Sequence, residues 1–275
     1  MPSRRREEYA VLYVAVATRA FRRYSTYTAA TLAGIFTNSV FGLIISFTYI
    51  AVWDQNPDAG GYDVTDALTY AWLAQAMIMT VAIWGGGATD DLADRIRTGD
   101  VAIDLYRPVN FLGWWLANDL GRAAYHLLTR GLAPTAVGAL LFDLRFPSSV
   151  LVWVLFLVSV LLAVVVSFAL RMLVAATAFW LLDQTGVRNL AIVFSTFFSG
   201  LVVPLVLFPG WTRDVAMALP WSAFVQVPAD IWLGQRSGLG VATGLAFQAG
   251  WSVVLLRVCA LVLRRADRKV VVQGG

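Results

Sequence analysis

Six apolar stretches of membrane-spanning length follow one another along the chain, separated by short polar segments. A run of roughly 20 apolar residues crosses a bilayer core of about 30 Å as a helix. No stretch shows the strand-length alternation of polar and apolar residues, so we expect an all-α polytopic membrane protein with a single transmembrane domain over residues 1–275. The expected spans are residues 29–52, 66–86, 121–142, 149–170, 190–208 and 240–263.

The fourth stretch remains apolar past Arg171, as far as residue 182. The piece after Arg171 has about 11 residues, which is too short to cross a bilayer. We therefore expect one long helix that extends from the 149–170 span toward 182. Arg171 then either snorkels to the headgroups or faces a polar seam.

Residues 7–24 precede the first span with a different pattern. Apolar and aromatic positions recur there every three to four residues, with arginines between them. This spacing is typical of an amphipathic helix that lies in the membrane interface. A merely basic anchor before the first span is an equal alternative.

Residues 211–234 are apolar but interrupted by prolines, which break helices. We expect an extracellular re-entrant hairpin here. A seventh crossing would place the basic carboxyl-terminal tail outside, against the bias of arginine toward the cytoplasmic side. Pro209 and Pro220 mark the breaks of this hairpin, and Trp211 and Trp221 are its expected anchors at the level of the lipid headgroups.

Basic residues gather on one side of this arrangement, at both ends of the chain and in the segment between the second and third spans. The positive-inside rule therefore places both termini in the cytoplasm. We expect the chain in the inner (plasma) membrane. The apolar share is 59% and the charged share 14%, far from a soluble domain. The net charge of +4 indicates contact with anionic membrane lipid, and we expect no nucleic acid partner.

The polar segment 89–107 (TDDLADRIRTGDVAIDLYR) is the longest charge-rich stretch between spans. Its charges of both signs are interleaved with Ile96, Val101, Ile103 and Leu105. Mixed charges around a small apolar centre suit a non-obligate protein interface. We therefore favour a docked partner over the alternative, a solvated loop.

The residue pattern supports no catalytic site. A phosphate-binding loop needs a lysine after its glycines, but the one lysine, Lys269, precedes Val270 in the carboxyl-terminal tail. Cys259 stands alone in the last span, and His126 has no second histidine at metal-ligand spacing. We expect no catalytic residue, no metal and no cofactor bound by this chain.

Polar side chains recur on the third span at a helical period. Ionisable groups at such depth usually face a bundle interior, a cavity or another subunit. Two interpretations stay open: a pathway or dimer seam, which Arg171 could also join, and headgroup snorkelling of the arginines. The stripe consists of Asn118, Arg122, His126 and Arg130, spaced by four residues.

Two stretches resemble the permease subunits of type 2 ABC exporters. In residues 96–110 (IRTGDVAIDLYRPVN), Gly99, Val101, Leu105 and Pro108 match the family's G-x-[L/V]-x-x-x-L-x-x-P segment. Gly99 is followed by Asp-Val rather than Thr-Leu-Glu, which is closer to a bacterial branch that often acts as paired related permeases.

The second stretch is residues 200–221 (GLVVPLVLFPGWTRDVAMALPW), in which Pro204, Pro209 and Pro220 match the family's approach to its outer hairpin. The order of elements is similar as well: an interfacial helix, two spans, a charged segment, three spans, a hairpin and a final span. The resemblance therefore covers nearly the whole chain in topology.

The resemblance implies a transmembrane subunit of an ATP-driven exporter that forms half of a translocation pathway. Segment 89–107 would be a cytoplasmic coupling helix docked on a separate nucleotide-binding ATPase subunit. Two copies of that subunit would bind ATP and Mg, and a second permease, related or identical, would complete the pathway. We expect an amphipathic or lipid-like cargo. The implied docking residues are Asp91, Arg95, Arg97, Gly99, Asp100, Asp104 and Arg107.

Two functions of other classes remain as alternatives. A secondary transporter would be expected to carry inverted repeats and membrane-embedded carboxylates, whereas the carboxylates here fall almost wholly in the expected loops. A non-transporting membrane assembly protein would act without any ATPase partner.

Overall fold

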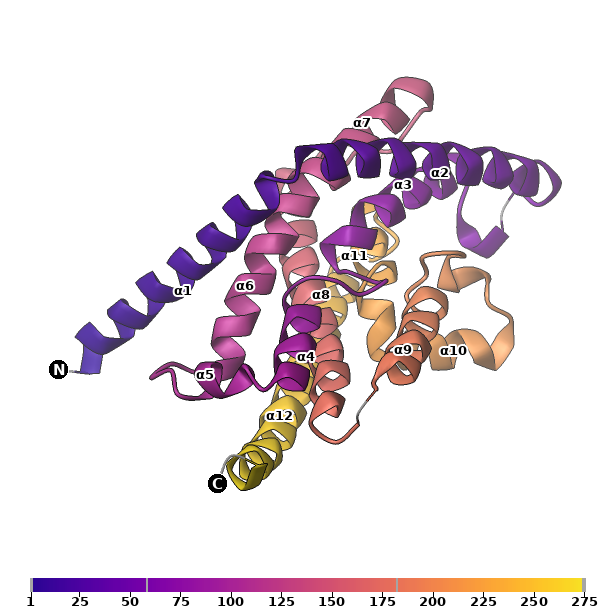
Figure 1. Cartoon of the computed structure of the whole chain (residues 1–275). Coiled ribbons are helices and arrows are strands. Elements are labelled where there is room, and N and C mark those ends of the chain that lie inside the picture. The colour runs from indigo at the N-terminus through magenta and orange to yellow at the C-terminus, as the bar shows by residue number, and fades with distance from the viewer. Residues whose placement is uncertain (1, 58, 182, 274–275) are drawn as a thin grey trace.

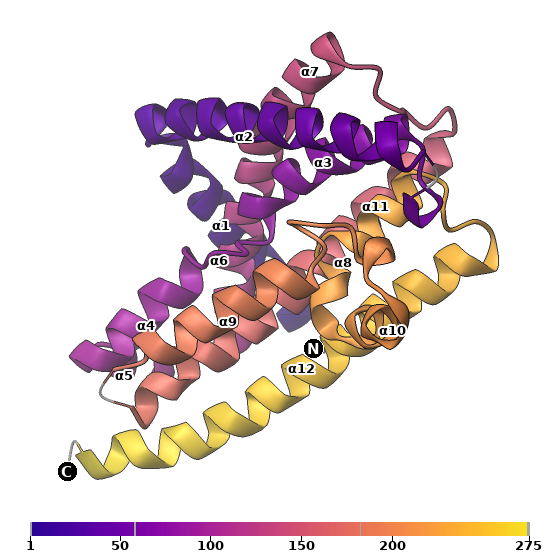
Figure 2. The ribbon, with the colours of Figure 1, turned by 90° about the vertical axis from the view of Figure 1, so that its right-hand side faces the viewer.

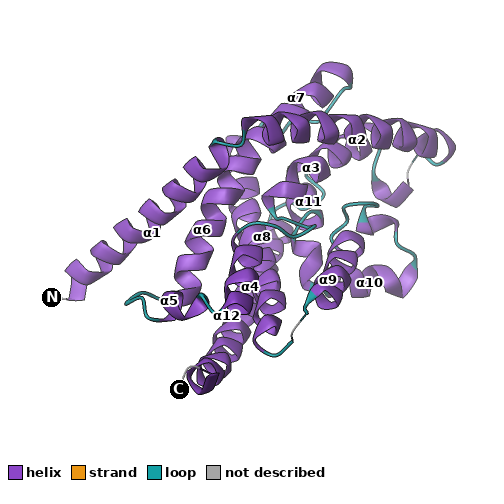
Figure 3. Ribbon diagram, in the orientation of Figure 1, coloured by secondary structure: helices purple, strands orange, loops and turns teal. Residues whose placement is uncertain are grey.

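The computed structural model describes residues 2–57, 59–181 and 183–273, and side chains between residues 8 and 266 of those ranges. Within them the chain consists of helices and connecting turns, with no strand, which confirms the all-α expectation (Figure 3). The α-helices are α1 (Pro2–Ser25), α2 (Thr28–Gln55), α3 (Val64–Thr80), α4 (Ala88–Thr98), α5 (Val101–Leu105), α6 (Phe111–His126), α7 (Leu132–Leu141), α8 (Val150–Ala176), α9 (Thr185–Phe198), α10 (Gly210–Ala218), α11 (Gln226–Trp232) and α12 (Leu239–Gln273). Short 3₁₀ turns occupy Ala59–Gly61, Thr177–Phe179, Leu205–Leu207 and Pro220–Ala223, and a π-helical turn occupies Leu127–Gly131.

Three helical stretches in the described part of the chain are long and apolar enough to cross a membrane: Thr28–Gln55, Val150–Phe179 and Leu239–Ala266. The second of these runs through Arg171 without a break, as one helix rather than two. Length and composition therefore establish three candidate spans, at the positions expected for the first, fourth and sixth.

The other expected spans differ in their helical limits. Helix α3 ends at Thr80, six residues before the expected end at 86, because a turn and three consecutive glycines follow it. Helices α6 and α7 form one rod joined by the π-helical turn, and this rod begins at Phe111, ten residues before the expected start at 121. The expected 190–208 stretch is helical only within α9, which ends at Phe198 before a proline-bearing turn.

The long helices pack in pairs. Helix α1 lies along α6, α3 lies against α2, and α12 runs beside α8. Gly121 on α6 allows the first of these contacts, because a Cβ atom there would collide with the backbone carbonyl oxygen of Ala17. Figure 1 shows α1 descending from its junction with α2, and Figures 1 and 2 show α2 running across the upper part of the molecule, with α7 extending above it.

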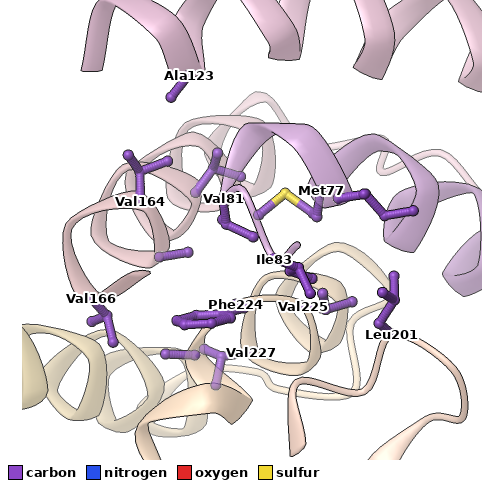
Figure 4. Close-up of a cluster of buried hydrophobic side chains, with 14 of the residues drawn as sticks. Met77, Val81, Ile83, Ala123, Val164, Val166, Leu201, Phe224, Val225 and Val227 are labelled. Carbon is purple, nitrogen blue, oxygen red and sulfur yellow. The ribbon is translucent and has the colours of Figure 1, made fainter. Parts of the chain in front are cut away.

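The apolar core lies between the end of α3, the middle of α8 and the hairpin. Met77, Val81 and Ile83 face Val164 and Val166 of α8 across Phe224, as Figure 4 shows. All of these side chains are buried. The turn that follows α3 is therefore anchored by apolar packing at the point where the polar segment begins.

The hairpin region folds as α10, a 3₁₀ turn and α11. Trp211 is 75% exposed and Pro209 is exposed, whereas Pro220 is buried and Trp221 half-buried. Helix α11 is buried along its whole length. Its Asp230 accepts hydrogen bonds from Tyr62, Gln226 and Arg236, so polar groups of the hairpin are bonded within the protein.

Candidate functional site

The turn between α3 and α4 is built from Gly85, Gly86 and Gly87, all with positive φ angles of 82°, 98° and 83°. Glycine adopts this backbone region without the steric cost that other residues carry. At Gly87 the absence of a side chain also makes room, because a Cβ atom there would lie 2.5 Å from Cδ of Arg122. The triplet thus serves close packing against the third span.

The polar segment, residues 89–107, folds as two short helices rather than one. The Asp90 carboxylate accepts a hydrogen bond from the Gly86 backbone at 2.9 Å, near the start of α4. Gly99 ends α4 in a left-handed conformation with φ of 86°, and α5 then folds back. One face of α4 is buried through Leu92 and Ala93, and the other face is polar.

The fold-back divides the expected docking residues into three groups. Arg97, Gly99 and Asp100 are exposed, and Asp91, Arg95 and Arg107 are half-buried. Asp104 is the exception, because its carboxylate binds Arg95 at 2.6 Å and Arg107 at 3.2 Å and its side chain is only 3% exposed. Asp104 therefore holds the two helices together from inside, which corrects its expected place on the contact surface.

Two apolar side chains share the exposed side of the segment with these charges. Tyr106 is 89% exposed and Ile103 is 60% exposed, whereas Val101 is buried at 2%. Of the interleaved apolar residues, Ile103 thus points outward and Val101 inward. Tyr106 was missed in the sequence because it follows the charge run without any periodic signal.

Above the segment lies a buried ionic cluster centred on Asp119 of α6. Asp119 is fully buried and pairs with Arg122 at 2.8 Å and with Arg171 at 2.6 Å. Arg122 also donates to the carbonyl oxygen of Thr80 at 2.9 Å, and Arg171 donates to the Thr89 hydroxyl at 3.1 Å. The Asp119 cluster (Asp119, Arg122, Arg171 and Thr89) therefore connects α3, α4, α6 and α8.

The stripe runs along α6 into the π-helical turn and is buried or half-buried at each of its positions. Arg122 is buried in the Asp119 cluster, His126 is 7% exposed, and Asn118 and Arg130 are half-buried. Arg171 also points into the protein instead of snorkelling outward, with a side chain 13% exposed. Asp119 was missed because it lies beside the stripe, although its spacing of three residues before Arg122 is a signal for a helical ion pair.

A groove of about 880 Å³ is lined by residues of α1, of the segment and of α6. Arg23 of α1 bridges it to Asp91 of α4 at 2.7 Å, and this hydrogen bond to the carboxylate raises the pKa of Arg23 above its usual value. Arg107 lies 4.5 Å above the ring of Trp114. Helix α1 and the polar segment are thus joined by an ion pair.

The described residues contain no group of three or more His, Cys, Asp or Glu side chains that could hold a metal ion. The arrangement instead links α4 to α6 and α8, because Arg171 of α8 donates hydrogen bonds to the Thr89 hydroxyl of α4 and to the Asp119 carboxylate of α6.

These features define a helical membrane protein with several candidate spans and a polar segment bonded to its long helices. Residues 39–274 match the model of the family described as ABC-2 family transporter protein. The chain therefore belongs to the ABC-2 transporter family and is a membrane component of a transporter. No curated protein matches the chain.

Proposed function

We propose that this chain is the permease subunit of an ATP-driven exporter and that segment 89–107 docks on a separate nucleotide-binding ATPase subunit. The proposal rests on one observation above all. The segment presents Arg97, Asp100 and Tyr106 outward, while its inner side is bound through Thr89 and the Asp119 cluster to the spans. An interface of this kind, apolar at its centre and charged around it, suits a partner that binds and moves.

The partner assembly follows the family resemblance. Two ATPase subunits bind ATP and Mg and approach each other, and each moves the segment beneath one permease. A second permease, identical or related, completes the pathway between the two. Five side chains would support that pathway or dimer seam. Arg122, His126 and Arg171 would do so from inside the protein, Asn118 from the groove beside α1, and Arg130 from a half-buried position.

Six crossings with both termini in the cytoplasm complete the proposed topology in the inner membrane. Helix α3, with 17 residues, is about 26 Å long and approaches the thickness of the bilayer core. The α6–α7 rod and the α9 region would supply the other two crossings beside the three long helices. Arg264 and Arg265 are exposed at the carboxyl-terminal end of α12. The side chains of Arg4, Arg5, Arg6, Arg268 and Lys269 lie outside the described residues.

The exposed apolar faces of the long helices favour an amphipathic or lipid-like cargo. This cargo would leave past the outer hairpin, which carries Trp211 and Trp221.

Ion-coupled secondary transport is the weaker alternative. The fully buried carboxylate of Asp119 lies in a helix, contrary to the expectation that carboxylates fall in loops, but two arginines neutralise it. A carboxylate held this way is unsuited to releasing and rebinding a proton at each cycle.

The test is purification of the chain in mild detergent with its natural partners. We expect a nucleotide-binding ATPase to co-purify with the wild type and to be lost in Arg97→Glu and Asp100→Arg. The matched control is Arg213→Glu, which replaces an exposed arginine of α10 and should retain the ATPase. Absence of any ATPase from the wild type, with ATP-dependent export unaffected by both charge reversals, contradicts the proposal and favours an assembly protein.

A further inference from the structure

A smaller hollow, which we call the elbow pocket, lies where α1 turns into α2 beside α6. Its volume is about 210 Å³, and its polar lining comes from Tyr24, Tyr27, Thr31, Tyr125, His126 and Arg130. The Tyr125 and Thr31 hydroxyls are bonded to each other at 2.8 Å and close one side of it. The pocket is separate from the groove beneath α1 and from the Asp119 cluster.

Arg130 is the one cation in this lining, and none of the described carboxylates pairs with it. Its recorded polar contact is a long hydrogen bond of 3.5 Å to the Asn38 side chain, and its Nε atom is enclosed without a partner among the described residues. Arg130 lies inside the expected third span. Charged side chains within a bilayer are costly and normally pair with an opposite charge, so this guanidinium lacks the anion that such a position requires.

The backbone on both sides is shaped for this arginine. Gly34 of α2 lies against its guanidinium, and a Cβ atom at that position would collide with it. Arg130 itself belongs to the π-helical turn Leu127–Gly131. Such turns within α-helices are rare and occur frequently at functional sites. The site is therefore built around Arg130 rather than left over from packing.

His126 adds a second unused polar group. Neither of its ring nitrogens has a hydrogen-bond partner among the described residues, and Nδ1 is enclosed. Its ring packs edge-on against Tyr24 at 5.3 Å and Tyr125 at 5.5 Å. A side chain that is 93% buried and lacks a partner for its polar atoms would gain from a ligand beside it.

We propose that the elbow pocket binds a phosphate group, either in the headgroup of an anionic inner-leaflet lipid or free in solution. The volume is below the roughly 300–1,000 Å³ of sites that enclose a drug-sized molecule, so it takes a headgroup but not an acyl chain. The apolar side chains of Leu32 and Phe36 on α2, 66% and 71% exposed, offer a surface for chains outside the pocket. Arg130 supplies the charge-assisted hydrogen bonds. The proposal depends on this geometry and not on ATP-driven export.

Native mass spectrometry of the full-length permease, with any subunits that co-purify, tests the site. The ligands are phosphatidylglycerol, diacylglycerol without a phosphate, and inorganic phosphate. We expect phosphatidylglycerol to bind and diacylglycerol not to bind. Loss of a charged hydrogen-bond partner should weaken binding about tenfold in Arg130→Gln, whereas the charge-matched Arg213→Gln should bind as the wild type does.

Gly34→Ala keeps the positive charge of Arg130 but displaces its guanidinium, so it should also weaken lipid binding. Arg130→Lys should bind the lipid more tightly than Arg130→Gln does. These two variants carry the test if Arg130→Gln does not fold. If inorganic phosphate competes with the lipid and its binding depends on Arg130, the ligand is free phosphate. If inorganic phosphate does not compete, the ligand is the lipid headgroup. Unchanged binding of both phosphate-bearing ligands in Arg130→Gln and Gly34→Ala overturns the proposal.

Discussion

Arg171 of α8 donates a hydrogen bond of 2.6 Å to the carboxylate of Asp119 on α6, and a second one of 3.1 Å to the Thr89 hydroxyl at the start of α4. One side chain thus links two long helices to the polar segment. Its removal should separate the movement of the segment from that of the spans.

Asp119→Asn removes the carboxylate that pairs with both Arg122 and Arg171. Breaking a buried pair leaves charge without compensation and costs about 3–5 kcal/mol. We expect a lower melting temperature in nanodiscs and ATPase activity in the complex that no longer drives transport. The control is Asp94→Asn, which should leave both properties near those of the wild type. Asp94 and Arg97 form an ion pair in which each of the two side chains is 69% exposed. Equal effects of the two substitutions would contradict a coupling role for the Asp119 cluster.

Gly87→Ala should disturb the turn that fastens the segment. The φ angle of 83° and the approach of Arg122 both oppose a Cβ atom there, and strain of this kind costs about 1–3 kcal/mol. Gly186→Ala is the matched control, since nothing lies within 4 Å of the added atom, and in the first turn of α9 it should stabilise by about 0.5–1 kcal/mol. Thermal unfolding followed in detergent measures both, and a Gly87→Ala variant as stable as the wild type contradicts the packing described here.

Gly121→Ala should push α1 away from α6, because the added Cβ atom meets the Ala17 carbonyl oxygen. We expect faster proteolysis of α1 and a weaker Arg23–Asp91 contact across the groove. Gly250→Ala adds the same atom to α12 where nothing lies within 4 Å. Limited proteolysis should distinguish the two, and an unchanged cleavage pattern in Gly121→Ala would show that α1 is not held by this contact.

Tyr106→Ala should weaken the ATPase contact without affecting the fold, because the side chain is 89% exposed. Exposed aromatic residues that become buried at an interface often contribute about 2 kcal/mol or more to binding. Titration of the purified ATPase into nanodiscs measures the loss. Tyr27→Ala, an aromatic residue 60% exposed at the start of α2, should bind the ATPase as the wild type does.

The sequence allowed good prediction of what depends on local pattern. Apolar run length located the helices around residues 28–55, 150–179 and 239–266, and the period of four residues located the inward-facing stripe that contains Arg122. Membership of the transporter family was also evident from Gly99 and the prolines near residue 209.

The features that could not be predicted from the sequence depend on contacts between distant segments. Asp119 and Arg171 are 52 residues apart in the chain, and no spacing rule joins them. Asp104 was placed on the contact surface because segment 89–107 was treated as a single face, whereas the fold-back at Gly99 turns that carboxylate inward. The early ends of α3 and α9 follow from turns whose geometry depends on their packing.

The central claim is that segment 89–107 contacts an ATPase subunit, and site-specific cross-linking in native membranes tests it most directly. A cysteine-reactive photo-cross-linker attached to Tyr106→Cys reports on the segment, and Leu140→Cys, 85% exposed at the end of α7, is the control. The native Cys259 is 1% exposed and should contribute little background. The account predicts an adduct with a nucleotide-binding ATPase from Tyr106→Cys and not from Leu140→Cys. Absence of that adduct, or equal yields from the two positions, would contradict it.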